Sequence, residues 1–304
     1  MYLFKSQNSV NQFLTSINGF QITLKREDQL HPTVSGNKFR KLKYNLKQAK
    51  QEGHQTLLTF GGPYSNHLAA TAATGKIMRF KTIGMVRGNE KRSMNPTMQF
   101  CKDQGMTLFP ISRAEYRQKD KPSWRLSLKK KWGDFYLLPE GGTNSLAVKG
   151  CKEILTKEDV DFDIIACSVG TGGTLAGLIE SALPHQEVIG FSALNNLNIR
   201  DDIKKWTTKE NWTLNNDYTF GGYAKITPEL IDFINTFNKN FKTPLDPVYT
   251  GKLLFGIFDM IKNKEWLTAK KILVIHTGGL QGVEGMNLKP VSYTHLTLPT
   301  IYSV

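Results

Sequence analysis

Residues 167–174 read Cys167-Ser168-Val169-Gly170-Thr171-Gly172-Gly173-Thr174 and lie between an apolar run and an amphipathic stretch. The apolar run, Asp163 to Val169, predicts a buried strand, and Thr174 to Leu183 predicts a helix that begins at the glycines. Glycines at such a junction let backbone N–H groups close on an anion, and the helix N-terminus favours its charge. The stretch therefore predicts an α/β fold with a phosphate site; a plain glycine-rich turn is the alternative.

Two familiar phosphate-binding motifs do not match this stretch. No Gly-Lys-Ser or Gly-Lys-Thr follows the glycines, and Leu175 stands where a dinucleotide-binding loop needs its third glycine. The next strand, Val188 to Ser192, lacks the terminal acidic residue that would hold an NAD ribose. A cradle for a bare phosphate group remains.

Strands and helices alternate along the chain on both sides of this stretch. The predicted strands are Gln21 to Leu24, Thr56 to Phe60, Thr82 to Val86, Phe135 to Leu138, Asp163 to Val169, Val188 to Ser192 and Ile272 to Ile275. The predicted helices are Asn37 to Glu52, Ser65 to Phe80, Asn144 to Leu155, Thr174 to Leu183, Pro228 to Asn240 and Lys252 to Lys262. Such alternation predicts mostly parallel sheets covered by helices on both faces.

Length and composition fit a two-lobed globular protein. The chain has 304 residues, 39% of them hydrophobic, and no stretch reaches the roughly 20 apolar residues of a membrane span. Because its start lacks a signal-like apolar run, we expect a cytoplasmic protein with no membrane contact. Cys101, Cys151 and Cys167 form no CxxC pair, which indicates ordinary thiols and no metal site.

The net charge of +14 does not by itself indicate nucleic-acid binding. Basic residues are spread from Lys5 to Lys289 without an arginine-rich tail, which favours attraction of anionic small molecules over recognition of nucleic acid. The last residues, Val291 to Val304, break the alternating pattern after Pro290. They resemble translated vector sequence, so we expect a non-native tail there.

One lysine differs from the many others by its place in a helical pattern. Lys38, Leu42, Leu46 and Ala49 share the apolar stripe, while we expect Arg40, Lys43, Lys47 and Lys50 on the solvent side. Lys38 would then point inward at the first turn, where burial and the helix dipole favour a neutral amine over the ammonium of free lysine, whose pKa is about 10.4. A neutral amine is what Schiff-base chemistry requires.

Three further stretches lie where open α/β sheets bind ligands, at the ends of strands or the starts of helices. They are Gly61-Gly62-Pro63-Tyr64-Ser65-Asn66-His67, Asp246-Pro247-Val248-Tyr249-Thr250-Gly251-Lys252 and His276-Thr277-Gly278-Gly279. Ser65 is placed to cap a helix. Its neighbours also supply an amide and an imidazole suited to a substrate carboxylate or a cofactor oxygen.

These stretches, together with Ser35 to Leu42, resemble in order and spacing the 1-aminocyclopropane-1-carboxylate deaminase and D-cysteine desulfhydrase family of fold type II pyridoxal 5'-phosphate (PLP) enzymes. The resemblance covers about Gln21 to Met286. It implies an α/β fold, similar to that of tryptophan synthase β, with two open, twisted, mostly parallel sheets flanked by helices and PLP in the interdomain cleft. We expect a large domain of residues 1–44 and 149–290, a small inserted domain of residues 45–148, and a homodimer.

The resemblance also implies roles for individual residues. Lys38 would carry PLP as a Schiff base, Asn66 would bond its phenolic oxygen and Thr250 its pyridine nitrogen. The phosphate would lie in the loop of Val169, Gly170, Thr171, Gly172, Gly173 and Thr174. Ser65, Asn66, His67, Tyr223 and Tyr249 would contact the substrate, with Lys38, Ser65 and Tyr249 in catalytic roles.

Two positions bear on the reaction. The deaminases of the family are expected to have Glu where this chain has Thr250, and Gln where it has His67. A carboxylate would strengthen the PLP ring as an electron sink, whereas a weaker sink suits departure of a thiolate. We therefore favour conversion of D-cysteine to pyruvate, ammonia and sulfide. The alternatives are 1-aminocyclopropane-1-carboxylate deamination, a lyase acting on another β-substituted amino acid, and a PLP-binding protein without turnover.

Overall fold

The computed structural model describes residues 9–88, 94–264, 266, 268 and 270–287. The suspected tail, Val291 to Val304, lies outside the described residues. Ten strands form two sheets in this part of the chain. None of the helices in these ranges is both long and apolar enough to cross a bilayer.

The larger sheet has six strands in the order β1-β2-β10-β7-β8-β9. Only β1 pairs antiparallel, through a hairpin with β2; the other neighbours are parallel. Strand β7 is buried along its whole length, as expected for a parallel strand covered on both faces. The strands are β1 (Asn11–Ile17), β2 (Phe20–Lys25), β7 (Ile164–Val169), β8 (Glu187–Ser192), β9 (Trp212–Asn215) and β10 (Lys271–Ile275).

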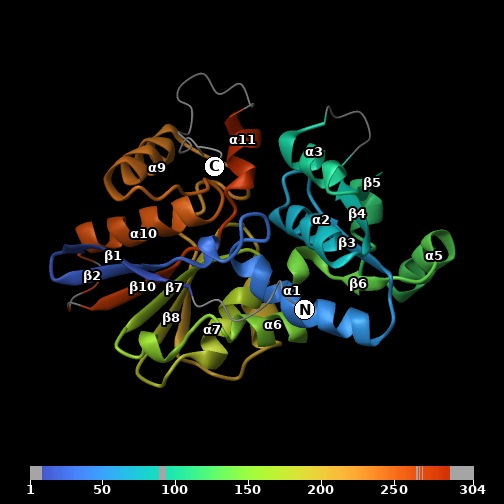
Figure 1. The fold of residues 1–304 in the computed structure, drawn as a ribbon. Helices are drawn as coiled ribbons and strands as arrows, with labels where there is room; N and C mark the ends of the chain where they lie inside the picture. The colour runs from blue at the N-terminus through green and yellow to red at the C-terminus, as the bar shows by residue number, and fades with distance from the viewer. Residues whose placement is uncertain (1–8, 89–93, 265, 267, 269, 288–304) are drawn as a thin grey trace.

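Helices cover both faces of this sheet (Figure 1). Apolar side chains of α9 (Pro228–Phe241) and α10 (Thr250–Lys262) form one core with the sheet. Those of α6 (Ser145–Cys151), α7 (Gly173–Ser181) and α8 (Ile199–Lys204) form a second core on the opposite face.

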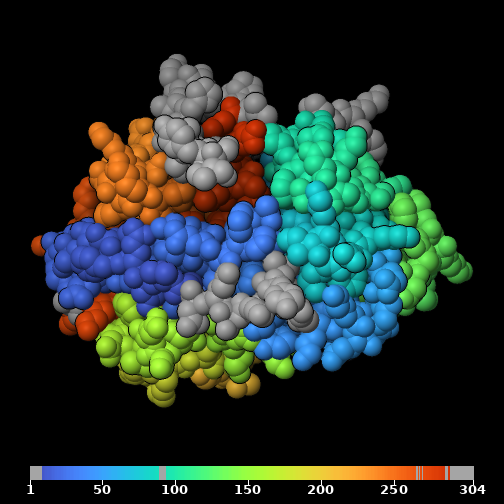
Figure 2. Space-filling model, viewed as in Figure 1, coloured from blue at the N-terminus to red at the C-terminus, as the bar shows by residue number. Residues whose placement is uncertain are grey.

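The smaller sheet is fully parallel, in the order β5-β4-β3-β6. Its strands are β3 (Thr56–Gly61), β4 (Lys81–Arg87), β5 (Met106–Ile111) and β6 (Tyr136–Leu138). Helices α1 (Asn37–Gln51), α2 (Asn66–Met78) and α3 (Pro96–Asp103) pack on one face, and α4 (Arg113–Tyr116) and α5 (Pro122–Trp132) on the other. Figure 2 shows the two lobes packed side by side.

The sheet topology confirms the expected fold class, two mostly parallel sheets flanked by helices. All four strands of the smaller sheet lie between Thr56 and Leu138, whereas the larger sheet draws strands from both sides of that segment. The division at residues 44/45 and 148/149 remains a proposal. Helix α1 crosses the first boundary, and its residues Leu42, Leu46 and Ala49 pack in the core of the smaller sheet.

The expected face of α1 is correct for the apolar residues and wrong for Arg40. Leu42, Leu46 and Ala49 are fully buried, and Lys47 and Lys50 are exposed. Arg40 was expected on the solvent side but is only 6% exposed. Its guanidinium donates two hydrogen bonds of 2.8 Å to the buried carboxylate of Glu27. This bidentate partner, distant in sequence, compensates the cost of burying the charge.

Candidate active site

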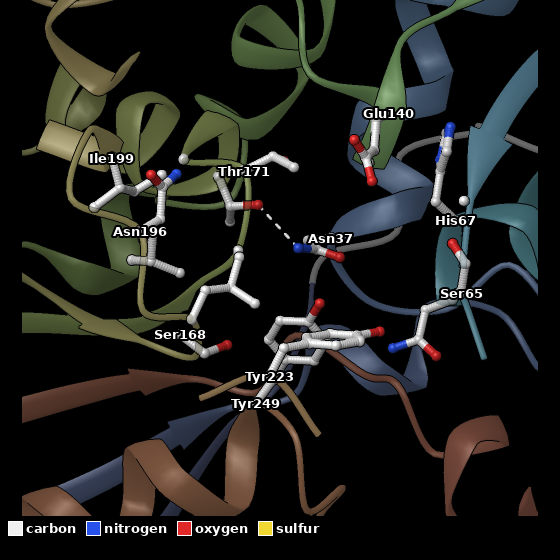
Figure 3. Close-up of a pocket in the computed structure, with 18 of the residues that line it drawn as sticks. Asn37, Ser65, His67, Glu140, Ser168, Thr171, Asn196, Ile199, Tyr223 and Tyr249 are labelled. Atoms are coloured by element: carbon white, nitrogen blue, oxygen red, sulfur yellow. Dashed lines mark hydrogen bonds between the residues drawn. The ribbon is translucent and has the colours of Figure 1, made fainter. Parts of the chain in front are cut away.

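A cavity of about 710 Å³ lies where the carboxyl ends of both sheets face each other. The turn after β3, the loop after β7 and the residues after β10 all contribute to its lining. Figure 3 shows Ser65, His67 and Glu140 on one side and Ser168, Thr171 and Asn196 on the other, with Tyr223 and Tyr249 between them. Stretches that are far apart in sequence thus meet in one cavity.

Lys38 lies at the first turn of α1 and its side chain reaches this cavity. The helix can start there because Gly36, with φ of 62°, approaches the backbone of Thr277 so closely that a Cβ would lie 1.9 Å from the Thr277 oxygen. Burial lowers the pKa of Lys38 well below that of free lysine, and the charge of Lys41 lowers it further. The sequence prediction of an inward-facing amine with a lowered pKa therefore agrees with the structure.

A second lysine, which the sequence analysis did not select, lies beside Lys38. Lys41 is 2% exposed, and its Nζ donates to the Gly141 carbonyl at 3.2 Å and to Thr143 Oγ1 at 2.9 Å. It also lies 3.4 Å from Thr171 Oγ1 in the glycine-rich loop. Burial lowers the pKa of Lys41 too. The i, i+3 spacing from Lys38, which brings side chains together on one helix face, was the available signal.

The glycine-rich loop follows β7 and leads directly into α7. Gly172 has φ of 78°, a left-handed conformation that glycine adopts at little cost. Asn37 Nδ2 donates to Thr174 Oγ1 at 2.9 Å, which ties the start of α1 to the start of α7. Five of the six predicted residues line the cavity, namely Val169, Gly170, Thr171, Gly172 and Thr174. Gly173 instead packs against Thr143, where a Cβ would approach that side chain to 2.7 Å.

The turn after β3 brings Ser65, Asn66 and His67 to the cavity lining. Ser65 caps α2 as expected, because its Oγ accepts a hydrogen bond from the Leu68 N–H at 3.3 Å. His67 is only 2% exposed, and its Nε2 lies 2.8 Å from Thr59 Oγ1. Burial lowers the pKa of His67 well below its usual value, and the nearby charges of Lys38 and Lys41 add to the effect. The imidazole is therefore neutral.

Tyr249 and Tyr223 line the large-lobe side of the cavity, and their ring centroids lie 6.4 Å apart at an interplanar angle of 62°. The two hydroxyls influence each other's pKa, which places the two phenols in one electrostatic unit. Burial raises the pKa of Tyr249 well above its usual value, so its hydroxyl stays protonated. Tyr249 also packs against the glycine-rich loop, since a Cβ on Gly170 would lie 3.2 Å from its ring.

Thr250 differs from the expectation that it faces the cofactor. It is 1% exposed and does not line the cavity. Its Oγ1 donates to Asp246 Oδ1 at 2.7 Å, and the same carboxylate accepts the backbone N–H groups of Val248, Tyr249 and Thr250 at 2.9 Å each. This capping of the start of α10 turns Thr250 away from the cavity while Tyr249 faces it.

A charged group at the small-lobe side of the cavity was also missed from sequence. Arg87, Lys119 and Glu140 line the cavity, with Glu140 lying 3.9 Å from Arg87 Nη1 and 3.4 Å from Lys119 Nζ. Arg87 ends β4 beside the turn after β3, so its position at the carboxyl end of a parallel strand was a usable signal.

The residues present fit PLP. A half-buried amine with a lowered pKa lines the same cavity as a glycine-rich loop at the N-terminus of a nine-residue helix, where donors suited to a phosphate converge. Lys38 would hold the aldehyde carbon, and the loop from Val169 to Thr174, with Lys41 beside Thr171, would hold the phosphate. The two-sheet fold and this site define a PLP-dependent enzyme of fold type II. In agreement, the family model described as "Pyridoxal-phosphate dependent enzyme" matches residues 11–278.

Individual relatives narrow the assignment. A Thermotoga maritima protein with the provisional name 1-aminocyclopropane-1-carboxylate deaminase is 33% identical over 299 residues, covering 90% of this chain and 94% of that protein. A mitochondrial protein of Arabidopsis thaliana, named bifunctional D-cysteine desulfhydrase/1-aminocyclopropane-1-carboxylate deaminase, is 28% identical and covers 88% of this chain and 74% of its own. The solved structure of an ACC deaminase homologue has a TM-score of 0.75 at 28% identity, covering 92% and 91% of the two chains. The chain belongs to the 1-aminocyclopropane-1-carboxylate deaminase and D-cysteine desulfhydrase family.

Proposed function

We propose that this enzyme catalyses β-elimination of D-cysteine, in which D-cysteine and water give pyruvate, ammonia and hydrogen sulfide. The observation that supports elimination chemistry is the Lys38 amine, whose pKa is lowered, in one cavity with the glycine-rich loop. When bound, PLP supplies an electron sink that acidifies the α-proton of an amino acid and lets a β-substituent depart. The C–S bond breaks with its electron pair on sulfur, and hydrolysis of the remaining three-carbon unit releases ammonia and pyruvate.

The residues around the cavity have complementary roles in this proposal. Lys38, neutral once the substrate is attached, would accept the α-proton at Nζ. The start of α2 with Ser65 and Asn66 would bind the substrate carboxylate through N–H, hydroxyl and amide donors. Tyr249, protonated because of its burial, could donate its proton to the departing sulfur.

The choice of D-cysteine over the cyclopropane substrate rests on two substitutions within the family pattern. Thr250 provides no carboxylate, and His67 supplies a neutral imidazole where a glutamine is expected. The missing carboxylate favours a weaker electron sink, which suits a good leaving group. Because Thr250 turns toward Asp246, its contribution would be the absence of a carboxylate rather than a contact with the ring.

The direct test is a product assay on PLP-loaded protein. D-cysteine should give sulfide and pyruvate in equal amounts, while L-cysteine and 1-aminocyclopropane-1-carboxylate should give far less product. Lys38→Ala serves as the inactive control. Formation of 2-oxobutanoate from 1-aminocyclopropane-1-carboxylate at a higher kcat/KM than sulfide from D-cysteine would replace this proposal with cyclopropane deamination.

Arg87 favours a second candidate, a lyase acting on an amino acid with an anionic β-substituent. Three charged side chains line the small-lobe side of the cavity: Arg87, Lys119 and Glu140. Their net charge is +1. Such a charge would attract an acidic leaving group. Faster elimination from D-cysteine sulfinate than from D-cysteine would favour this candidate. The homodimer and the cytoplasmic location expected from sequence stay predictions.

A further inference from the structure

Lys252 is a buried lysine that forms no ion pair with a carboxylate of the described residues. It lies in the first turn of α10, is 2% exposed, and donates through Nζ to the carbonyl oxygens of Thr219 at 2.7 Å and Gly222 at 2.8 Å. Burial lowers its pKa to about 8, and the charge of Asp246 partly opposes this effect. Buried ammonium groups are costly and are retained where their hydrogen bonds fix something.

The two carbonyls belong to a loop with an unfavourable backbone. Between β9 and α9, Phe220 and Ala224 have φ of 52° and 55°, and Gly221 and Gly222 have φ of 85° and 114°. Left-handed non-glycine residues are strained and persist only where surrounding contacts fix them. The same carbonyls also close the turns of the loop, since the Gly222 N–H donates to Thr219 O at 3.0 Å and the Lys225 N–H to Gly222 O at 3.2 Å.

This loop carries Tyr223 into the cavity. Tyr223 follows Gly222 directly and meets Tyr249 through an edge contact between the two rings. Tyr249 immediately precedes α10, three residues before Lys252. The start of one helix therefore fixes both tyrosines: Tyr249 through the Asp246 cap, and Tyr223 through the ammonium of Lys252.

We propose that Lys252 is a positioning residue that holds the loop at 219–225 in its strained conformation and so keeps Tyr223 against Tyr249 in the cavity. The inference about the loop rests on the contacts alone. Its consequence for catalysis rests on the proposed function, in which the tyrosine pair contacts the substrate.

The loop itself is tested by hydrogen exchange on the PLP-loaded protein. Lys252→Met keeps the length of the side chain but removes the donors, so the amides of Gly222 and Lys225 should exchange about tenfold faster, which corresponds to about 1.4 kcal/mol. Lys262→Met, at the exposed end of the same helix, is the matched control and should leave both amides unchanged. Unchanged protection in folded Lys252→Met overturns the proposal. If that variant does not fold, Lys252→Leu, which also removes both donors, takes its place with the same criterion.

A double-mutant cycle tests the consequence. Lys252→Met should raise KM several-fold with melting temperature and PLP content near those of the wild type, and Lys252→Arg should restore most of the loss. In a Tyr223→Ala background, Lys252→Met should have little further effect, because the residue it positions is absent. Full additivity of the two effects would show that Lys252 does not act through Tyr223. If wild-type protein turns over none of the proposed substrates, the proposed function fails, while hydrogen exchange still decides the role of Lys252.

Discussion

Lys38 and Lys41 donate to the same acceptor, the carbonyl oxygen of Gly141, with both Nζ atoms 3.2 Å from it. Two ammonium groups that share one carbonyl repel each other, so the arrangement favours a neutral amine on one of them. Lys38 is the one whose pKa is lowered further by its neighbour. Lys41 has two hydroxyls close to it in addition. The arrangement therefore favours Lys38 as the reactive amine, with Lys41 held beside it by its hydrogen bonds.

Lys38→Ala should abolish attachment of PLP. Borohydride reduction of the wild-type protein is expected to leave a stable pyridoxyl group on the peptide that contains Lys38, detectable by mass spectrometry. The exposed Lys47 on the same helix provides the control, and Lys47→Ala should label as the wild type does. Undiminished labelling of Lys38→Ala at another lysine would mean that the inward-facing stripe of α1 was misassigned.

Lys41→Met should raise the pKa of Lys38, because it removes the positive charge that helps to lower it. Less of the Lys38 amine is then neutral at a given pH, so attachment of an aldehyde should require a higher pH. Pyridoxal is the better probe than PLP because it lacks the phosphate that Lys41 would contact. The measurement is the pH dependence of the rate of pyridoxal attachment to cofactor-free protein, and a profile identical to that of the wild type would contradict the coupling.

The central strands and helices could be predicted from the sequence because each carries a continuous apolar run or stripe. The three missed strands, β1, β5 and β9, are all at sheet edges. Strand β1 is only partly buried, β5 contains Pro110, and β9 has four residues. Edge strands need no apolar run on both faces and tolerate proline, so their patterns are weak.

The sequence predicted the site residues in motifs that follow a strand. It was less informative where the direction of a side chain determines whether the residue faces the cavity. Tyr249 and Thr250 are adjacent, and which of them faces the cavity depends on the cap that Asp246 provides at the start of α10. Burial of Arg40 depends on Glu27, which lies outside α1. The carbonyl that Lys38 and Lys41 share belongs to Gly141, about 100 residues further along the chain. No local pattern contains such long-range partners.

Gly36→Ala should disrupt the placement of Lys38. The substitution adds a Cβ that would lie 1.9 Å from the Thr277 oxygen, in a residue with φ of 62°. With ψ of −149° this backbone lies in a region that essentially only glycine adopts, which alone costs alanine about 1–3 kcal/mol, and relief of the clash must move the start of α1. We expect a lower melting temperature and a large loss of PLP affinity.

Gly53, just beyond the other end of α1, provides the control, because it has φ of 80° and nothing lies within 4 Å of its Cβ position. Gly53→Ala should therefore lower stability without lowering PLP affinity. Equal PLP affinity in the two variants would argue against a role of the Gly36 contact in the site.

Thr250→Val separates the two possible roles of Thr250. In the structure its hydroxyl donates to the buried carboxylate of Asp246, whose pKa is raised by burial and held down by the hydrogen bonds from Thr250, Tyr249 and Val248. Removing the hydroxyl should cost about 1.5–3 kcal/mol of the free energy of unfolding, the usual contribution of a hydrogen bond to a charged group. It should also raise the pKa of Asp246 further, because the ionised form loses a donor. Because the pKa of Asp246 is higher in the folded than in the unfolded protein, the free energy of unfolding falls as the pH rises past the pKa of the unfolded state. Thr250→Val should make this fall larger. Urea unfolding at several pH values measures both effects, and Thr250→Ser, which keeps the hydroxyl, should resemble the wild type. A variant with wild-type stability and an altered absorbance spectrum of bound PLP would instead place the Thr250 hydroxyl at the cofactor ring, as the family resemblance first implied.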